Sequence, residues 1–346
     1  MAKGEKMKIL KKILVGFVLL FSSLTLMNSI CDGDDEPGDP DAGLYHTYDE
    51  VQSELDSLAA AHESIADFTS IGKSLQGRDL WAIKISDNVQ SDEDEKVGVL
   101  LGAHHAREWI SVEVPLKIAC YLLDNYDAQA QIKNLIDQTE IWIVPMVNPD
   151  GHHYSVTSDR LWRKNRRNNG DGSYGVDLNR NYSYQWGGPG SSGDTFSETY
   201  RGPEPFSEPE TRACRDFLTN IEPSALISYH SYSQLVLFPW GYTNSPAPDK
   251  TLMESLAKTM ADKIKAVHGV TYTPDQASGL YLASGDTNDW LYALLRVPSY
   301  TIELRPRSSY PGFVLPESEI QPTFEENLPA ALFLLEWMIS LDTSSQ

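Results

Sequence analysis

The sequence predicts an α/β fold in which a mixed, largely parallel central β-sheet is covered by helices on both faces of a single domain. Short, continuous apolar runs, typical of strands buried on both faces, alternate with segments of helical spacing. No internal repeat and no Pro/Gly-rich linker follows residue 43, so about 300 residues are expected to form one domain. The apolar runs are residues 80–85, 97–102, 141–147, 225–229 and 299–304.

The amino-terminal segment has the pattern of an export signal. Five lysines precede an apolar stretch at residues 13–27. This length suits a signal peptide better than a membrane span, although residues 13–30 could just cross a bilayer. We expect residues 1–31 to be a signal peptide cleaved near Cys31. The alternatives are a lipoprotein signal, with Cys31 carrying the lipid, and an uncleaved anchor.

The rest of the chain divides into a short tether and one folded domain. Residues 32–43 are acidic and rich in Pro and Gly, so we expect a disordered tether. Residues 44–342 contain the apolar runs and the helical patterns. Thr47 and Glu50 form a capping-box pattern that predicts the first helix, and one-face apolar spacing predicts another at 252–268.

Composition limits the partners and the role of disulfides. The formal net charge is −21, which argues against nucleic acid as a partner. Hydrophobic residues make up 41% of the chain, enough for a large core. Cys120 and Cys214 each fall in a predicted helix, where we expect buried free thiols.

Polar residues of ligand or catalytic type follow four of the apolar runs. His105, Asn148 and His230 come at or just after the ends of three runs, and Glu303 lies at the end of the last. Ligand sites in open α/β sheets lie beyond the carboxyl ends of the strands. These residues could therefore converge on one crevice, although they are far apart in sequence.

His105 and Glu108 have the spacing of metal ligands. Residues three apart in a first helical turn lie on one side and can share a cation. A catalytic zinc needs three protein ligands and an open position for water, and two histidines with a carboxylate meet this need. His230 is the best third candidate because it ends its own strand. We expect His104 to turn toward the sheet or toward solvent.

The other histidines have ordinary interpretations. We expect packed or surface positions for three of them and a solvated loop for the two that follow the turn signal "NPDG". The first three are His46, His62 and His268, and the other two are His152 and His153.

Five motifs, in matching order and spacing, resemble the zinc metallocarboxypeptidases of the A, B and T types, closest in character to the bacterial T type. The resemblance covers about residues 44 to 340 and implies a carboxypeptidase-like fold whose single catalytic domain spans residues 44–342. The motifs are "GAHHAREWIS", "GVDLNRNY" (175–182), "SYHSYSQLVLFPWG" (228–241), "YLASGDTNDW" (281–290) and "YTIELRP" (300–306).

The resemblance implies one Zn²⁺ ion per chain, held by His105, Glu108 and His230. Asp177 matches the carboxylate that accepts the other ring N–H of the first histidine ligand and so fixes its orientation. Arg107 resembles the arginine that lines the groove for the upstream part of the peptide.

The resemblance also implies how the substrate is held. Asn179 and Arg180 match the pair that binds the terminal carboxylate, for which a guanidinium fork is well suited. Tyr281 matches the mobile tyrosine that closes over the bound residue. Ser231 and Tyr232, which follow the last zinc ligand, are expected to contact substrate.

Two further residues are implied in catalysis. Glu303 matches the general base that takes a proton from the zinc-bound water, whose pKa zinc lowers toward ~7. Arg163 matches the arginine that faces the developing oxyanion. A plain basic surface patch at residues 160–167 is the alternative for Arg163.

The side-chain pocket differs from those of both animal types. Its floor position is Asn288, where A-type relatives have an apolar residue and B-type relatives an aspartate. Asp286 stands two residues earlier, as in T-type relatives. We therefore expect broad specificity for hydrophobic and basic C-terminal residues. The alternative is that Asp286 only caps a turn beside Gly285.

These features together predict an exported zinc carboxypeptidase, secreted or extracytoplasmic, that acts as a monomer on peptide and protein C-termini. No membrane contact is expected for the catalytic domain unless Cys31 is lipidated. The alternatives are a related amidase or endopeptidase acting on cell-wall peptides and a catalytically dead binding protein. A folded propeptide is not evident in the sequence. The acidic excess leaves room for bound Ca²⁺, but no dedicated loop is evident.

Overall fold

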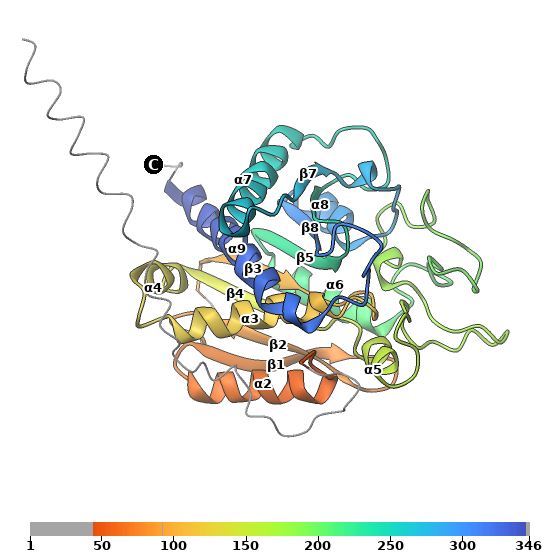
Figure 1. Ribbon diagram of the computed structural model, residues 1–346, viewed down its shortest axis with the longest axis horizontal. Helices are drawn as coiled ribbons and strands as arrows, with labels where there is room; N and C mark the ends of the chain where they lie inside the picture. Colours follow the sequence, from red (N-terminus) through yellow and green to blue (C-terminus); the bar gives the residue numbers. More distant parts are fainter. Residues whose placement is uncertain (1–43, 92, 344–346) are drawn as a thin grey trace, which may run out of the picture. The chain divides into compact units, whose positions relative to one another are not determined.

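The computed structural model describes residues 44–91 and 93–343, and the predicted signal and tether lie outside this range. One eight-stranded sheet runs through the described region in the order β1-β2-β4-β3-β5-β8-β6-β7 (Figure 1). The strands are β1 (Ala66–Lys73), β2 (Asp79–Ile85), β3 (Lys96–Leu101), β4 (Thr139–Val144), β5 (Ala225–Ser231), β6 (Leu235–Phe238), β7 (Thr273–Gln276) and β8 (Ser299–Leu304).

The sheet is mixed, as predicted. Strands β4, β3, β5 and β8 pair in parallel, whereas β1, β2 and β6 join by antiparallel pairing. The five predicted runs correspond to β2, β3, β4, β5 and β8. Strands β1, β6 and β7 were missed because they are short or lie at an edge, where no continuous apolar run is needed.

Helices cover both faces of the sheet. Adjacent strand residues point to opposite faces. On β3, Val99 joins a core cluster with Cys214 of α6 and Leu291 of α8, whereas Gly98 lies against Leu335 of α9. The helices are α2 (Tyr48–Ala61), α3 (Ile110–Asp124), α4 (Ala130–Ile136), α5 (Pro149–Thr157), α6 (Pro209–Ile221), α7 (Lys250–His268), α8 (Thr287–Leu295) and α9 (Ile320–Thr343).

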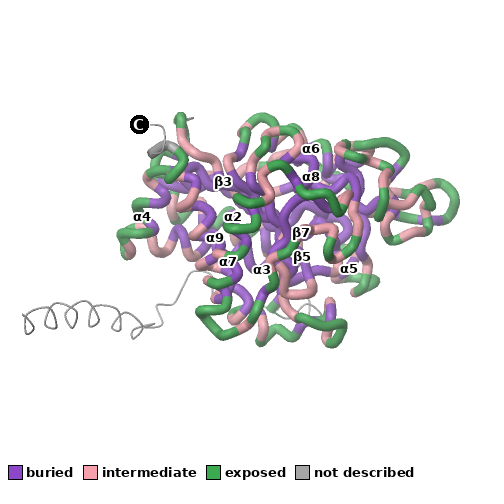
Figure 2. The backbone as a smooth tube through the Cα atoms, turned by 90° about the horizontal axis from the view of Figure 1, so that it is seen from above, coloured by how far each residue is buried: buried purple, intermediate pink, exposed green. Residues whose placement is uncertain are grey.

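Burial follows this layered arrangement. Figure 2 shows buried backbone concentrated in the strands and in the helix segments that face them, with exposed segments in the peripheral loops. Among the described residues, none of the helices combines the length and the apolar character that a membrane span requires.

The predicted helix boundaries are reproduced closely. Thr47 and Glu50 form a reciprocal capping box at the start of α2. Helix α7 ends at Gly269, whose φ of 74° suits a residue without a side chain. Cys214 is a buried free thiol as expected, but Cys120 is disulfide-bonded, so that expectation was wrong.

The expectation for His152 was also wrong. "NPDG" begins helix α5 instead of a loop, with the Asn148 side chain accepting from the Gly151 amide. This places His152 in the core at 1% exposure, with its Nε2 2.9 Å from the His46 carbonyl oxygen. His46 in turn lies 2.7 Å from the buried carboxylate of Glu113 on α3. Pro at the first helical position is common, and here it overrides the turn signal.

Candidate metal centre and active site

Two of the predicted ligands lie in the loop that joins β3 to α3. Gly102 leads into this loop, where a Cβ would collide with neighbouring carbonyl oxygens. The chain then turns tightly, and the Glu108 amide donates to the His105 carbonyl oxygen at 3.2 Å. Helix α3 begins only at Ile110, so the turn before the helix, rather than its first helical turn, brings the two side chains together.

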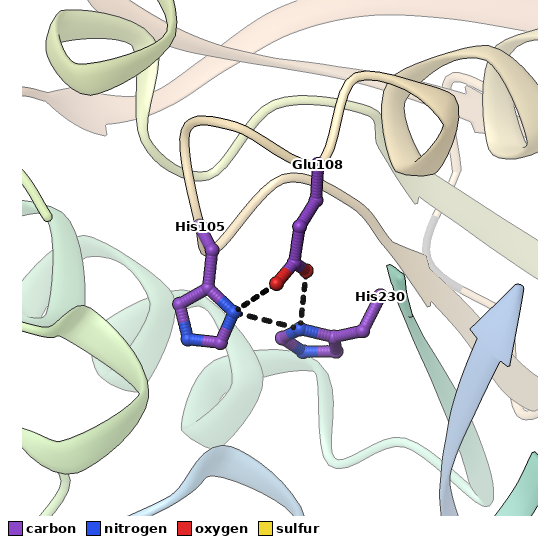
Figure 3. A group of neighbouring side chains, drawn as sticks. All are labelled: His105, Glu108 and His230. Carbon is purple, nitrogen blue, oxygen red and sulfur yellow. Dashed lines mark hydrogen bonds and ion pairs between the residues drawn. The ribbon is translucent and has the colours of Figure 1, made fainter. Parts of the chain in front are cut away.

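The third predicted ligand, His230, reaches the same point from β5 (Figure 3). Glu108 bridges the two histidines: its Oε1 lies 2.9 Å from His105 Nδ1 and its Oε2 lies 3.0 Å from His230 Nδ1. The two Nδ1 atoms are 3.1 Å apart. All three side chains are buried, with their ligand-type atoms within 4.8 Å of one another.

This arrangement fits one zinc ion. Two ring nitrogens aimed at each other at 3.1 Å need a cation, or a proton shared between them, to be satisfied together. Two histidines and a carboxylate form a catalytic zinc donor set that leaves a coordination position open for water. His105 and His230 also line the adjoining pocket, so that position could face substrate.

Asp177 and Arg163 lie behind the first histidine. Asp177 Oδ1 is 3.2 Å from His105 Nε2, as expected for a carboxylate that orients a ligand ring. Arg163 donates from Nε and Nη2 to Asp177 Oδ2 at 3.1 and 2.8 Å. Burial opposes the charged form of Asp177, but Arg163, Arg180 and His105 hold its pKa well below the usual range. Arg163 is thus part of the buried site rather than a surface patch.

Glu303 lies beside the metal cluster because of strand register. It is on β8 directly opposite His230 of β5, and both line the pocket. Burial raises the pKa of Glu303 well above its usual value, and the neighbouring Glu108 carboxylate adds to the effect. In the protein alone, Glu303 therefore favours a proton.

The predicted carboxylate-binding pair lines the same pocket. Asn179 and Arg180 lie in a 3₁₀ turn (η1, Leu178–Arg180), which Asp177 caps. Arg180 donates from Nε to a loop carbonyl oxygen at 3.0 Å, which fixes the direction of its guanidinium. Tyr281 is half exposed at the pocket, and the centre of its ring lies 5.7 Å from Arg180 Cζ.

The predicted specificity residues, Asp286 and Asn288, line the same pocket; we call this part its specificity end, and the part lined by His105 and His230 its metal end. Asp286 caps helix α8, accepting from the Asp289 amide at 2.9 Å through Oδ1. Its Oδ2 is buried without a hydrogen-bond partner among the described residues, as is Oδ1 of Asn288. The side-chain Nδ2 of Asn288 donates to Thr301 Oγ1 at 2.7 Å. Asp286 therefore both caps the helix and lines the pocket.

Arg107, Ser231 and Tyr232 lie beside the cluster and not in this pocket. The Ser231 amide donates to Glu108 Oε2 at 3.2 Å, so its backbone supports a predicted metal ligand. Arg107 and Tyr232 both pack against the ring of Phe313. The ring centre lies 4.2 Å from Arg107 Cζ and 4.9 Å from the centre of the Tyr232 ring. The role of Arg107 in lining a substrate groove stays a prediction.

Some site residues escaped sequence reasoning. Thr301, Asp289 and Gly241 line the pocket. Alternation on β8 could have indicated Thr301, which shares a face with Glu303. Asn148, which was expected in the crevice, instead caps α5 and donates to the His104 carbonyl oxygen.

No calcium site emerges from the described residues. Apart from the zinc-type cluster, the one other grouping of ligand-type side chains there is Asp87, Glu93 and Glu95 on a largely exposed loop. Exposed acidic groups commonly gather without an ion.

The fold and site define a metal-dependent hydrolase, and comparison with known proteins identifies its family. The zinc carboxypeptidase family model matches residues 51–330. Carboxypeptidase B of Astacus astacus is 38% identical over 290 residues, which cover 82% of this chain and 93% of that protein. Carboxypeptidase A2 of Mus musculus is 36% identical over 288 residues, covering 82% and 68%.

A solved structure agrees. Thrombin activatable fibrinolysis inhibitor superposes with a TM-score of 0.81 at 34% identity, covering 86% of this chain and 75% of that chain. The chain belongs to the zinc carboxypeptidase family and is a metallocarboxypeptidase, a hydrolase of the EC 3.4.17 type.

Proposed function

We propose that this enzyme is exported and removes single residues from peptide and protein C-termini, accepting both hydrophobic and basic residues in the manner of the T type. The observation that carries the proposal is one pocket lined by both histidines of the metal cluster, by Glu303 and by the Asn179–Arg180 pair. A free C-terminal carboxylate held by the pair would place its peptide bond between the cluster and Glu303.

In the proposed mechanism, Glu303 moves two protons. Zinc held by His105, Glu108 and His230 would polarise the peptide carbonyl and make water acidic enough to lose a proton near neutral pH. Glu303 takes that proton as water attacks and then delivers a proton to the leaving amine. The raised pKa of Glu303 would fall again with a divalent cation held by the cluster, which suits a group that alternates between base and acid.

Two arginines are proposed to stabilise the two negative charges of the reacting substrate, the terminal carboxylate and the developing oxyanion. Arg180 binds the terminal carboxylate in fork geometry, and Asn179 adds an amide donor. Arg163 Nη1, the guanidinium nitrogen that makes no hydrogen bond to Asp177, is proposed to stabilise the developing oxyanion. Removing such a donor typically costs about 10²–10³ in rate.

The specificity proposal rests on the unpartnered acceptors. Buried polar atoms without partners are costly, and a substrate donor would satisfy Asp286 Oδ2 and Asn288 Oδ1 together. Burial raises the pKa of Asp286, which eases binding of an apolar side chain, and the positive charge of a basic side chain would favour the ionised form. One pocket can therefore accept both classes.

The amidase or endopeptidase alternative is not favoured. An enzyme that cleaves within a chain has no need of a carboxylate-binding arginine, yet Arg180 lines the pocket beside Glu303. Secretion and the monomeric state remain part of the proposal, and fractionation of expressing cells with size-exclusion chromatography tests both.

Hydrolysis of blocked dipeptides tests the function. We expect cleavage of benzoyl-Gly-Phe and benzoyl-Gly-Arg, loss of both activities with o-phenanthroline, and recovery with Zn²⁺. The matched control is benzoyl-Gly-Phe amide, which lacks the free carboxylate and should resist cleavage. Equal cleavage of the amide would contradict an exopeptidase, and cell-wall peptides would then be the next substrates.

A further inference from the structure

A buried row of polar side chains connects the metal cluster to the carboxylate-binding residue. At its centre is His104, whose side chain is fully buried and does not line the pocket. Its Nδ1 is 3.4 Å from Ser228 Oγ, which is itself 3.2 Å from His230 Nε2. Its Nε2 is 2.9 Å from Thr287 Oγ1, which is 3.0 Å from Asn179 Oδ1.

The direction of these hydrogen bonds can be derived from the substrate end. The backbone amide of Thr287 can only donate, and it lies 3.0 Å from the Asn179 side chain. The atom facing it is therefore the amide oxygen, which can only accept. The Thr287 hydroxyl must then donate to the same oxygen, so its lone pairs accept a proton from His104 Nε2.

The metal end is compatible with this assignment. A histidine ligand binds zinc through a nitrogen without a proton. In His230 that nitrogen is Nδ1, which leaves the proton on Nε2 to be donated to Ser228 Oγ. The Ser228 hydroxyl proton is then free to be donated to His104 Nδ1. The substrate end thus requires the proton of His104 on Nε2, and the metal end allows the neutral tautomer in which Nδ1 accepts from Ser228.

Two further contacts hold His104 in place. Its ring is stacked on that of His230, with centroids 5.6 Å apart and planes 18° apart. The Tyr182 hydroxyl oxygen lies 3.1 Å from His104 Nε2 and can accept a second, bifurcated hydrogen bond from the Nε2–H group. A buried histidine with partners on both ring nitrogens is specified by this network and not by packing alone.

We propose that His104 is a positioning residue that holds the Asn179 amide toward the substrate carboxylate and the Nδ1 lone pair of His230 toward the metal. The inference rests on the proposed function. One branch runs through Thr287 to Asn179 and the other through Ser228 to His230. Each branch should affect a different measured quantity.

Two small substitutions separate the branches. Thr287→Val keeps the backbone amide but removes the hydroxyl, and we expect KM for benzoyl-Gly-Phe to rise about tenfold with the zinc dissociation constant unchanged. Ser228→Ala should weaken zinc binding about tenfold, measured by chelator competition without substrate, because outer partners of metal ligands typically contribute 10–100-fold. Thermal unfolding of each variant checks that it is folded.

Replacing His104 tests the residue at which the two branches meet. Asn carries an oxygen near the position of Nδ1 but nothing near Nε2, whereas Gln can place an amide donor near Nε2. We expect His104→Asn to raise KM like Thr287→Val, with no further rise in the double variant, because both changes break one branch. His104→Gln should instead weaken zinc binding and leave KM within about twofold.

The outcomes distinguish the two levels of the proposal. If the wild-type protein neither binds zinc nor cleaves the dipeptide, the proposed function fails and the inference fails with it. If the wild type is active but Thr287→Val and Ser228→Ala change KM and zinc affinity together, or neither, the inference alone is overturned. That pair of variants decides the matter even if the His104 variants do not fold.

Discussion

The metal end and the specificity end of the active-site pocket differ in the partners that the protein provides for their polar atoms. At the metal end, His230 Nε2 forms a hydrogen bond with Ser228 Oγ, and His105 Nε2, although without a hydrogen bond, faces the Asp177 carboxylate at 3.2 Å. At the specificity end, the buried acceptors Asp286 Oδ2 and Asn288 Oδ1 have no hydrogen-bond partner among the described residues. Side chains of the protein thus orient the metal end, and we expect the substrate to supply the missing hydrogen bonds at the other end.

Replacing Glu303 should have the largest effect at the metal end. Gln keeps the shape of Glu303 but cannot accept the proton from water, so Glu303→Gln should lower kcat by about 10²–10⁴. Zinc content should stay at the wild-type value because Glu303 is not a ligand. Steady-state kinetics with metal analysis measures both, and a kcat within tenfold of wild type would exclude Glu303 as the base.

Replacing Asp177 should have the next largest effect. Asp177→Asn removes the charge that orients His105 and pairs with Arg163, so zinc affinity should fall about 10–100-fold. Chelator competition measures this directly. Asp286→Asn is the matched control from the other end of the pocket, and its zinc affinity should not change. Equal losses in both variants would show that the two ends are not independent.

We expect the free energy of unfolding to depend on pH through the pair of His46 and Glu113. Glu113 lies on α3, the helix that follows the metal loop. Burial disfavours charge on His46, but Glu113 outweighs it and raises the His46 pKa to about 9. Because the folded pKa exceeds the unfolded value, this stabilisation is complete below pH ~6.5 and is lost as pH rises through about 9. With partial screening by solvent, we expect a loss of about 2 kcal/mol.

Urea unfolding at pH 6 and pH 9.5 measures this loss, with His46→Gln as the control. The wild type should lose about 2 kcal/mol more than the variant between these pH values. The same pH dependence in both proteins would mean that the pair does not stabilise the support of the metal loop.

The central strands were predictable from sequence because both of their faces are buried. The last four residues of β3 and all seven of β5 are buried, so most of each strand is a continuous apolar run. Edge strand β7, "TPDQ", has no buried residue and therefore no such pattern. Local signals also misled: "NPDG" opens helix α5, and tertiary packing buries His152 on it.

The site shows the same limit. The predicted residues carry recognisable motifs, and the structure places His105, Glu108, His230 and Glu303 around one point. The unpartnered oxygen of Asp286 could not be seen in the sequence, because it depends on which groups reach that atom in three dimensions.

The measurement that tests the central claim most directly is the ratio of kcat/KM for benzoyl-Gly-Arg to that for benzoyl-Gly-Phe, in wild type and in Asp286→Asn. If the substrate completes the specificity end, the variant should lower the ratio about 100-fold, a change of ~2.7 kcal/mol. Activity on the Phe peptide should be kept. An unchanged ratio would contradict the account, since the acceptors at that end would then not meet the substrate side chain.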